Sequence, residues 1–212
     1  DPALFSKVEG GSQSWRKPGL DAETAREIVR NLLAATNPVL YVGGGILLAQ
    51  ASEELRAFVD HLQIPVAHSL MGKGALPDDH PLVLGMTGFW GTQLTNDTCL
   101  GADWVLGLGT RFKEADCSSW YRDYTFNIPP TKLMHIDIEP AEIGRNFPTE
   151  IGAVADLKIA LRALADAARE LHPQAKPSPA IATKIAENRL RFAADNAAMA
   201  TSDAFPMMPE RI

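Results

Sequence analysis

Short apolar runs alternate with longer amphipathic segments along most of this chain. The run at 37–42 is rich in β-branched residues and is followed by three glycines, a pattern typical of a buried parallel strand that ends in a tight turn. Similar runs predict strands at 64–69, 104–109, 131–138 and 151–155. The pattern therefore predicts a central, mostly parallel sheet of five to six strands.

Apolar positions repeated every three or four residues predict helices between these strands. Asp21 and Asp156 stand where N-caps belong, and Pro140 suits a first helical position. Strands that alternate with helices indicate a three-layer α/β/α fold, Rossmann-like and of the NAD/FAD-binding, DHS-like kind. The helices are expected at 21–35, 48–62, 92–102, 156–171 and 181–199, with a short one at 140–144.

Glycine or aspartate stands at nearly every predicted strand end. In open α/β sheets, ligands bind at the carboxyl ends of the strands, and glycine lets a ligand approach bare backbone. A nucleotide-sized ligand is therefore expected along one edge of the sheet, although the spacing fits neither G-x-G-x-x-G nor a P-loop. The glycines in question are Gly43 to Gly45, Gly72 and Gly74, Gly85 and Gly88, and Gly107 and Gly109.

Three charged residues follow strand ends, and each has two interpretations. Arg111 either clamps a phosphate with its planar guanidinium group or lies in a solvated loop. Asp137 either accepts hydrogen bonds from ribose hydroxyls or caps the next helix. Asp156 has the same two interpretations, and capping is favoured.

The sequence contains no recognisable catalytic constellation. The two cysteines, Cys99 and Cys117, lack metal-type spacing and are interpreted as incidental intracellular thiols. His135 lies inside a predicted strand and is expected to be a packed residue. Neither a Ser-His-Asp set nor a metal site can be assembled from the scattered histidines. This pattern favours a binding or scaffolding domain over a self-contained enzyme.

Composition excludes some classes of binding partner. The chain of 212 residues is 46% hydrophobic and 22% charged, with a net charge of −6 and no basic block, which argues against nucleic acid. No apolar run reaches the roughly 18 residues that a membrane helix needs. A cytoplasmic location is expected, and the absence of an initial methionine suggests a piece of a longer protein. The expected layout is a linker arm at 1–20, a nucleotide-binding-like domain at 21–166, a helical linker at 167–202 and the start of another domain at 203–212.

Five motifs occur in an order that is familiar from one family. Together they resemble the middle domain of thiamine diphosphate-dependent enzymes, especially the acetolactate synthase-like branch. The resemblance covers about residues 21–166. The motifs are Val42–Leu47, Ser69–Gly74, Leu84–Gly88, Gly107–Phe112 and His135–Gly144.

The resemblance implies a parent enzyme with three α/β domains. A pyrimidine-binding domain supplies the activating glutamate, and a diphosphate-binding domain supplies a Gly-Asp-Gly…Asn-Asn metal motif. Thiamine diphosphate and Mg²⁺ lie between these outer domains, in homodimers or homotetramers that decarboxylate or ligate 2-keto acids. Neither motif is present here, so the resemblance implies a chain that is not catalytic alone. Residues 203–212 would open the diphosphate-binding domain.

The resemblance also implies a nucleotide crevice, which holds FAD or ADP in some relatives and is empty in others. Three departures count against FAD: Lys113-Glu114-Ala115 replaces Asp-Asp-Arg, Ala155 replaces the glycine before Asp156, and Thr87 replaces a histidine. The residues that match the crevice are Gly43, Gly44, Gly45, Ser69, Leu70, Met71, Gly85, Met86, Thr87, Gly88, Gly109, Thr110, Arg111, Asp137, Ile138 and Asp156.

Other classes of protein remain open at this point. One is an independent NAD/FAD-binding protein, such as an electron-transfer flavoprotein-like domain. A sirtuin-like deacylase would need a catalytic histidine and usually a zinc module, which two cysteines cannot build. A small-molecule sensor could use the same crevice, but no output surface is evident.

Overall fold

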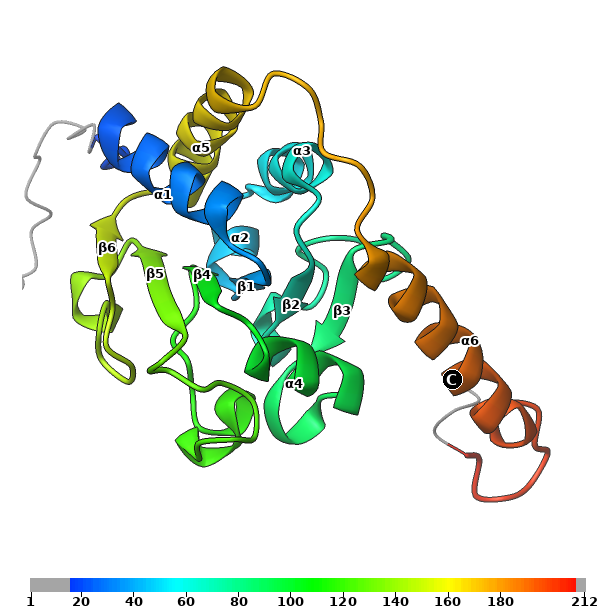
Figure 1. The fold of residues 1–212 in the computed structure, drawn as a ribbon. Helices are drawn as coiled ribbons and strands as arrows, with labels where there is room; N and C mark the ends of the chain where they lie inside the picture. Colours follow the sequence, from blue (N-terminus) through cyan, green and yellow to red (C-terminus); the bar gives the residue numbers. More distant parts are fainter. Residues whose placement is uncertain (1–15, 209–212) are drawn as a thin grey trace, which may run out of the picture.

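Six parallel strands form one sheet in the computed structural model, which describes residues 16–208 (Figure 1). The strand order is β3-β2-β1-β4-β5-β6, so the direction of strand addition reverses between β1 and β4. This is the order of dinucleotide-binding folds, in which ligands bind at the reversal point. The strands are β1 (Pro38–Val42), β2 (Val66–His68), β3 (Val83–Met86), β4 (Trp104–Leu108), β5 (Lys132–Asp137) and β6 (Ile151–Val154).

Helices cover the two faces of the sheet unequally. The helices α1 (Ala22–Ala34), α3 (Ser52–Leu62) and α5 (Leu157–Leu171) lie on one face and bury their apolar stripes against it (Figure 1). The opposite face carries α4 (Gln93–Leu100) and the connection at 109–131, which includes the 3₁₀ segment η4 (Ala115–Trp120). The predicted three-layer α/β/α class is confirmed, with one layer partly irregular.

Aspartate caps fix the starts of two long helices. The side chain of Asp21 accepts a hydrogen bond from Thr24 N at 2.9 Å, and Asp156 accepts from the N–H groups of Lys158 and Ile159. Each bond satisfies a backbone donor that the helix itself leaves unpaired. The caps predicted for α1 and α5 are therefore confirmed.

The structure corrects three local predictions. The helix expected at 48–62 is two helices, α2 (Gly45–Leu48) and α3, because the chain turns left-handed at Gln50, whose φ is 52°. The segment interpreted only as a glycine cluster contains β3, whose register is shifted by a bulge opposite Ala67 and whose Gly85 has a φ of 113°. The helix expected at 140–144 is the short 3₁₀ segment η5 (Pro140–Glu142).

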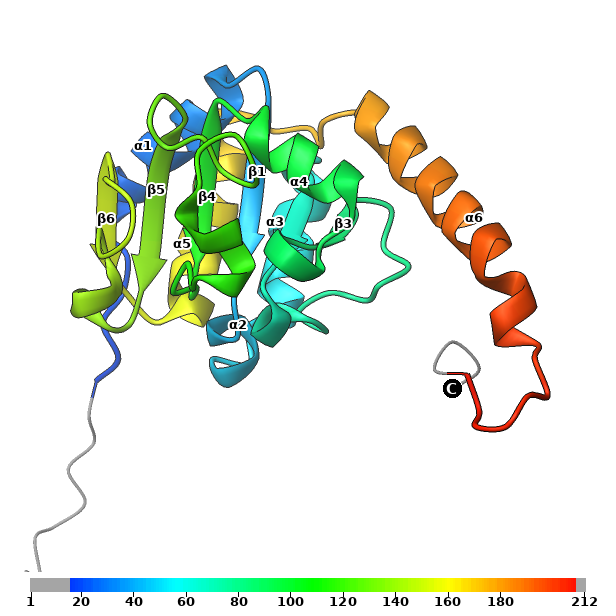
Figure 2. The ribbon, with the colours of Figure 1, turned by 90° about the horizontal axis from the view of Figure 1, so that it is seen from below.

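The last long helix, α6 (Ala180–Ala200), stands beside the body of the domain rather than over the sheet (Figure 1). Ile185 is its only buried residue. In Figure 2, α6 begins level with the amino edge of the sheet and runs toward the level of its carboxyl edge. Arg189 anchors it by donating hydrogen bonds to the carbonyl oxygens of Asp79, His80 and Val83.

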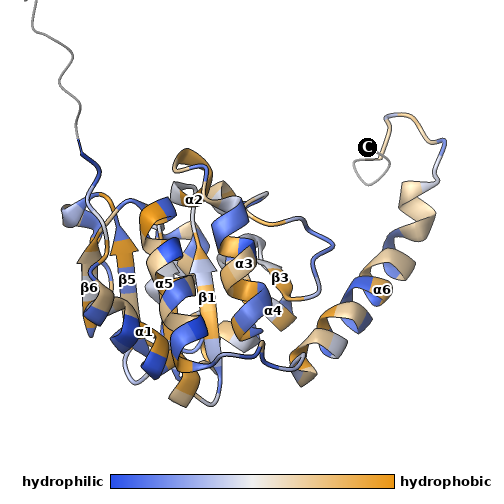
Figure 3. Ribbon diagram, turned by 90° about the horizontal axis from the view of Figure 1, so that it is seen from above, coloured by the Kyte–Doolittle hydropathy of each residue, from blue (hydrophilic) through white to orange (hydrophobic). Residues whose placement is uncertain are grey.

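Hydrophobic and hydrophilic residues alternate along the helices α1, α3 and α5, which cover one face of the sheet (Figure 3). No helix among residues 16–208 is both long and apolar enough to span a membrane. Most of the predicted arm at 1–20 and the last four residues of the predicted 203–212 segment lie outside the described residues.

Candidate functional site at the carboxyl edge of the sheet

The ends of β1 and β4 approach each other backbone to backbone at the reversal point. A Cβ on Gly43 would lie 2.2 Å from the carbonyl oxygen of Gly109, and a Cβ on Gly45 would lie 2.7 Å from the Cα of Gly109. Gly44 is less crowded, since its added Cβ would meet Met71 at 3.1 Å. The packing of one strand end on another therefore accounts for part of the glycine pattern, whereas Gly44 is less constrained by it.

A cavity of 160 Å³ opens at this junction. Pockets for whole small-molecule ligands are typically about 300–1,000 Å³. The cavity is therefore large enough for one part of a nucleotide, such as a ribose or a phosphate, with the remainder lying along the open edge. Five residues predicted from the sequence line it together: Gly45, Gly109, Asp137, Ile138 and Asp156.

Asp137 is the acid best placed for sugar hydroxyls. It ends β5, is 7% exposed and lines the cavity. Its Oδ1 accepts a hydrogen bond from Glu139 N at 2.9 Å, while Oδ2 accepts none from the described residues. Glu139, rather than Asp137, is the N-cap of η5. The geometry therefore leaves one carboxylate oxygen available to a ligand.

Asp156 is already engaged by the protein. Besides capping α5, its Oδ2 accepts a hydrogen bond from Lys17 Nζ at 2.7 Å, and its N–H donates to the carbonyl of Pro18. Burial acts to raise the pKa of Asp156, but the bonds from Lys17 and from the N–H groups of Ile159 and Lys158 outweigh it and hold the pKa below its ordinary value. Lys17, from the segment before α1, thus lines the cavity. The sequence analysis did not predict this residue.

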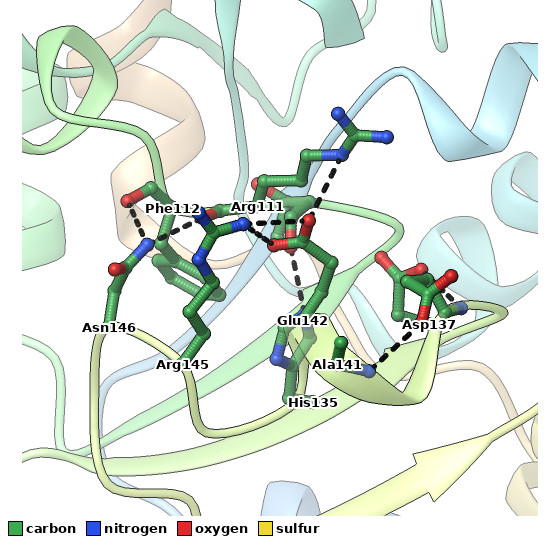
Figure 4. A network of polar contacts seen from close by, with 10 residues as sticks. Arg111, Phe112, His135, Asp137, Ala141, Glu142, Arg145 and Asn146 are labelled. Carbon is green, nitrogen blue, oxygen red and sulfur yellow. Dashed lines mark hydrogen bonds and ion pairs between the residues drawn. The ribbon is translucent and has the colours of Figure 1, made fainter.

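Arg111 projects from the turn after β4 with 61% of its side chain exposed. The next residue, Phe112, has a φ of 47° and a buried ring, for which Gly107 leaves room: a Cβ there would lie 2.9 Å from that ring. Asn146 Nδ2 donates to the carbonyl oxygens of Arg111 and Phe112 at 2.9 and 3.1 Å. The buried ring of Phe112 and the hydrogen bonds from Asn146 therefore fix the backbone at Arg111 (Figure 4).

His135 lies beneath the same turn and is buried, as predicted. Its Nε2 is 2.8 Å from the carbonyl oxygen of Thr110, so the ring donates there in the matching tautomer. Burial lowers the pKa of His135 despite that bond, which favours the neutral ring. His135 therefore supports the turn.

The remaining predicted residues lie along the same edge but outside the small cavity. Ser69 caps the 3₁₀ segment η2 (Leu70–Gly72), in which Leu70 and Met71 are exposed. Thr87 is buried and donates to the hydroxyl of Tyr41 at 3.3 Å. Gly85 and Met86 belong to β3, Gly43 and Gly44 to the β1 turn, and the buried hydroxyl of Thr110 has no partner among the described residues.

A larger hollow of 770 Å³ lies on the β3 side of the edge. Gly88 lines it together with the exposed rings of Phe89 and Trp90 from η3 (Gly88–Trp90) and of Tyr121 and Tyr124. Sequence reasoning missed these aromatic residues because they follow no helical or strand period. Five of the predicted residues therefore line the small cavity and Gly88 lines the larger hollow, so the predicted residues do not share one continuous pocket.

The described residues offer no resident metal site. No group of three or more His, Cys, Asp or Glu side chains between residues 16 and 208 is arranged to hold a metal ion. Both cysteines are buried free thiols, and burial raises the pKa of each well above its ordinary value. The donor set of the described residues therefore does not fit Mg²⁺.

The six parallel strands and their order define an α/β domain with the topology of dinucleotide-binding folds. The chain belongs to the family described as "Thiamine pyrophosphate enzyme, central domain", whose model matches residues 25–164. It is 39% identical over 139 residues to a probable acetolactate synthase large subunit of Methanocaldococcus jannaschii, covering 66% of this chain and 23% of that protein. It is 38% identical over 156 residues to a glyoxylate carboligase of Escherichia coli O157:H7, covering 73% of this chain and 26% of the relative.

A solved structure supports the fold. The benzoylformate decarboxylase of Polynucleobacter necessarius matches with a TM-score of 0.64 and 20% identity, over 83% of this chain and 32% of that chain. The chain therefore spans about a quarter of the length of the curated relatives that it matches. The predicted resemblance to the central domain of thiamine diphosphate-dependent enzymes is confirmed.

Proposed function

We propose that this chain is the central domain of an acetolactate synthase-like enzyme that decarboxylates or ligates 2-keto acids. The match of the central-domain family over residues 25–164 carries this proposal. Thiamine diphosphate and Mg²⁺ would be held by the pyrimidine-binding and diphosphate-binding domains of the same parent, in a homodimer or homotetramer. Catalysis would then require those neighbours, with this domain bridging them in the cytoplasm.

The second part of the proposal is an adenine nucleotide, ADP or FAD, at the carboxyl edge of the sheet. The cavity at the β1–β4 reversal point supports it, since ligands of such sheets bind there. Asp137 would accept hydrogen bonds from the ribose, Gly44 would face the ligand with bare backbone, and Arg111 would bind a phosphate. Lys17 would leave Asp156 or contact the ligand beside it.

Isothermal titration of the chain with ADP and with FAD tests the nucleotide. Both Arg111→Met and Asp137→Asn should weaken binding roughly ten- to hundredfold, because each removes charge-assisted hydrogen bonds worth about 1.5–3 kcal/mol. Arg30→Met, on α1 away from the cavity, is the matched control and should bind as the unaltered chain does. Absence of heat with both ligands would reject the nucleotide and leave a purely architectural domain.

A further inference from the structure

Two arginines converge on one buried carboxylate beside the crevice (Figure 4). Glu142 has a side chain that is only 9% exposed, whereas the side chains of Arg111 and Arg145 are each 61% exposed. Arg145 Nη1 lies 3.1 and 3.2 Å from the two carboxylate oxygens of Glu142. Arg111 Nε lies 3.6 Å from one of the same oxygens.

These distances show that Glu142 interacts more strongly with Arg145 than with Arg111. Arg145 engages both oxygens within hydrogen-bond range, and Arg111 keeps one longer contact through Nε. The two terminal nitrogens of Arg111 point away from Glu142 (Figure 4). The cluster therefore has one positive charge in excess, and that charge resides on the arginine whose donors are free to bind an anion.

Without Arg145, the same carboxylate would neutralise Arg111. A buried carboxylate that loses its partner is costly, so Glu142 would draw Arg111 into a full ion pair. The fork of Arg111 would then be occupied by protein and lost to a ligand. Asn146 would still hold the backbone of Arg111, so the change would affect the side chain alone.

We propose that Arg145 is a positioning residue: by holding Glu142, it keeps Arg111 free to bind a phosphate-bearing anion at the carboxyl edge. Arg145 does not need to contact the ligand. The identity of that ligand as a nucleotide diphosphate rests on the function proposed above, whereas the anion site itself can be tested with inorganic pyrophosphate.

The experiment measures pyrophosphate affinity at low salt and follows the Nε–Hε resonance of Arg111 by NMR. The unaltered chain should bind, with that resonance shifted. Arg145→Met should weaken binding about tenfold, the loss expected when one charged hydrogen-bonding partner is removed. Arg145→Lys should lose less, because an ammonium group can still hold Glu142. Arg169→Met, which removes a similarly exposed arginine on α5, is the control for net charge and should have little effect.

The decisive variant combines Arg145→Met with Glu142→Gln. If Arg145 acts through Glu142, removal of the carboxylate charge should restore pyrophosphate affinity to within about threefold, since nothing then competes for Arg111. Thermal unfolding of each variant identifies a loss of fold. Failure of this rescue in a folded protein, an unmoved Arg111 resonance, or unchanged affinity in Arg145→Met would each overturn the inference. Pyrophosphate binding with rescue but no ADP or FAD binding would reject only the nucleotide.

Discussion

Asp156 shows how one side chain serves both the fold and the crevice. It caps α5 through Oδ1 and binds Lys17 through Oδ2, so the start of a helix and the segment before α1 meet at the same carboxylate. Lys17 is 61% exposed, and ion pairs of this kind contribute about 0–1 kcal/mol. The cap is the larger contribution, at about 0.5–2 kcal/mol.

Two substitutions separate these roles. Asp156→Asn keeps a good capping residue and removes the charge, so it should cost less than about 1 kcal/mol at pH 7. Asp156→Ala removes both and should cost about 1–2 kcal/mol. Urea unfolding of the two variants beside the unaltered chain measures the difference. Equal losses in both would show that the charge, and not the cap, carries the stability.

The same residue predicts a pH dependence. Its folded-state pKa is held below the unfolded value of about 3.9, so the unfolded state binds more protons in that range. Its contribution is therefore present above about pH 4 and is lost as the pH falls through the lower folded-state pKa. Unfolding free energy measured between pH 6 and pH 3 should fall more steeply in the unaltered chain than in Asp156→Asn. Parallel curves would contradict this assignment.

The sequence predicted site residues at strand ends because glycine and aspartate follow buried strands there. Five of these residues line one cavity. Lys17, Glu142 and Arg145 could not be predicted as neighbours of that site. Each lies in a segment without periodicity. Lys17 and Glu142 reach the site through tertiary contacts, and Arg145 reaches it through its near neighbour in the chain, Glu142. Charge alone does not distinguish such residues from the other exposed lysines and arginines of the chain.

Elements were predictable where burial sets a regular pattern. The helices α1 and α5 have apolar stripes and aspartate caps, and the strands β1, β4 and β5 are buried runs. β3 was not predictable as a strand, because a bulge and Gly85 interrupt it. The 109–131 connection replaces a covering helix with an irregular layer held by the buried rings of Phe112 and Phe126.

The attachment of α6 depends on few contacts. Arg189 donates to the carbonyl oxygens of Asp79 and His80, before β3, and of Val83, the first residue of β3, and Ile185 supplies the buried apolar contact. Arg189→Ala should therefore release the helix, with hydrogen bonds from a charged donor worth about 1.5–3 kcal/mol each before solvent competition. Hydrogen exchange across residues 180–190 should accelerate at least about tenfold, while the rest of the domain keeps its protection.

Arg191→Ala is the matched control for this helix. Arg191 donates to Asn188 within α6 and has the same helix propensity, so its loss should leave exchange at 180–190 nearly unchanged. Equal acceleration in both variants would mean that α6 is held by other contacts.

Outside α6 and the segment that follows it, the exposed large apolar side chains share one region of the described chain. In residues 16–171, they all follow or end strands at the carboxyl edge or lie in the connection that starts there: Leu47, Leu48, Leu70, Met71, Phe89, Trp90, Trp120, Tyr121, Tyr124, Ile138, Val154 and Ile159. Large exposed apolar side chains that are concentrated in one region are typical of an interaction site. We expect the other domains of the proposed parent enzyme to cover part of this edge.

Self-association of the isolated chain should depend on that edge. Leu48→Ser combined with Phe89→Ser removes two side chains that are 89% and 77% exposed, and sedimentation velocity should show less association than in the unaltered chain. Leu190→Ser combined with Phe192→Ser, on α6, is the control, with exposures of 73% and 62%. Association that falls equally in both pairs would contradict a special role for the carboxyl edge.

The length of α6 determines both the distance and the direction in which the chain continues after the helix. Each residue of an α-helix advances the chain by about 1.5 Å and turns it by about 100°, so the 21 residues of α6 carry whatever follows them by about 30 Å. An insertion of two residues would swing the following segment to nearly the opposite side, whereas one of seven would lengthen the spacer and almost preserve its heading. Natural length variants of this helix should therefore cluster near whole turns.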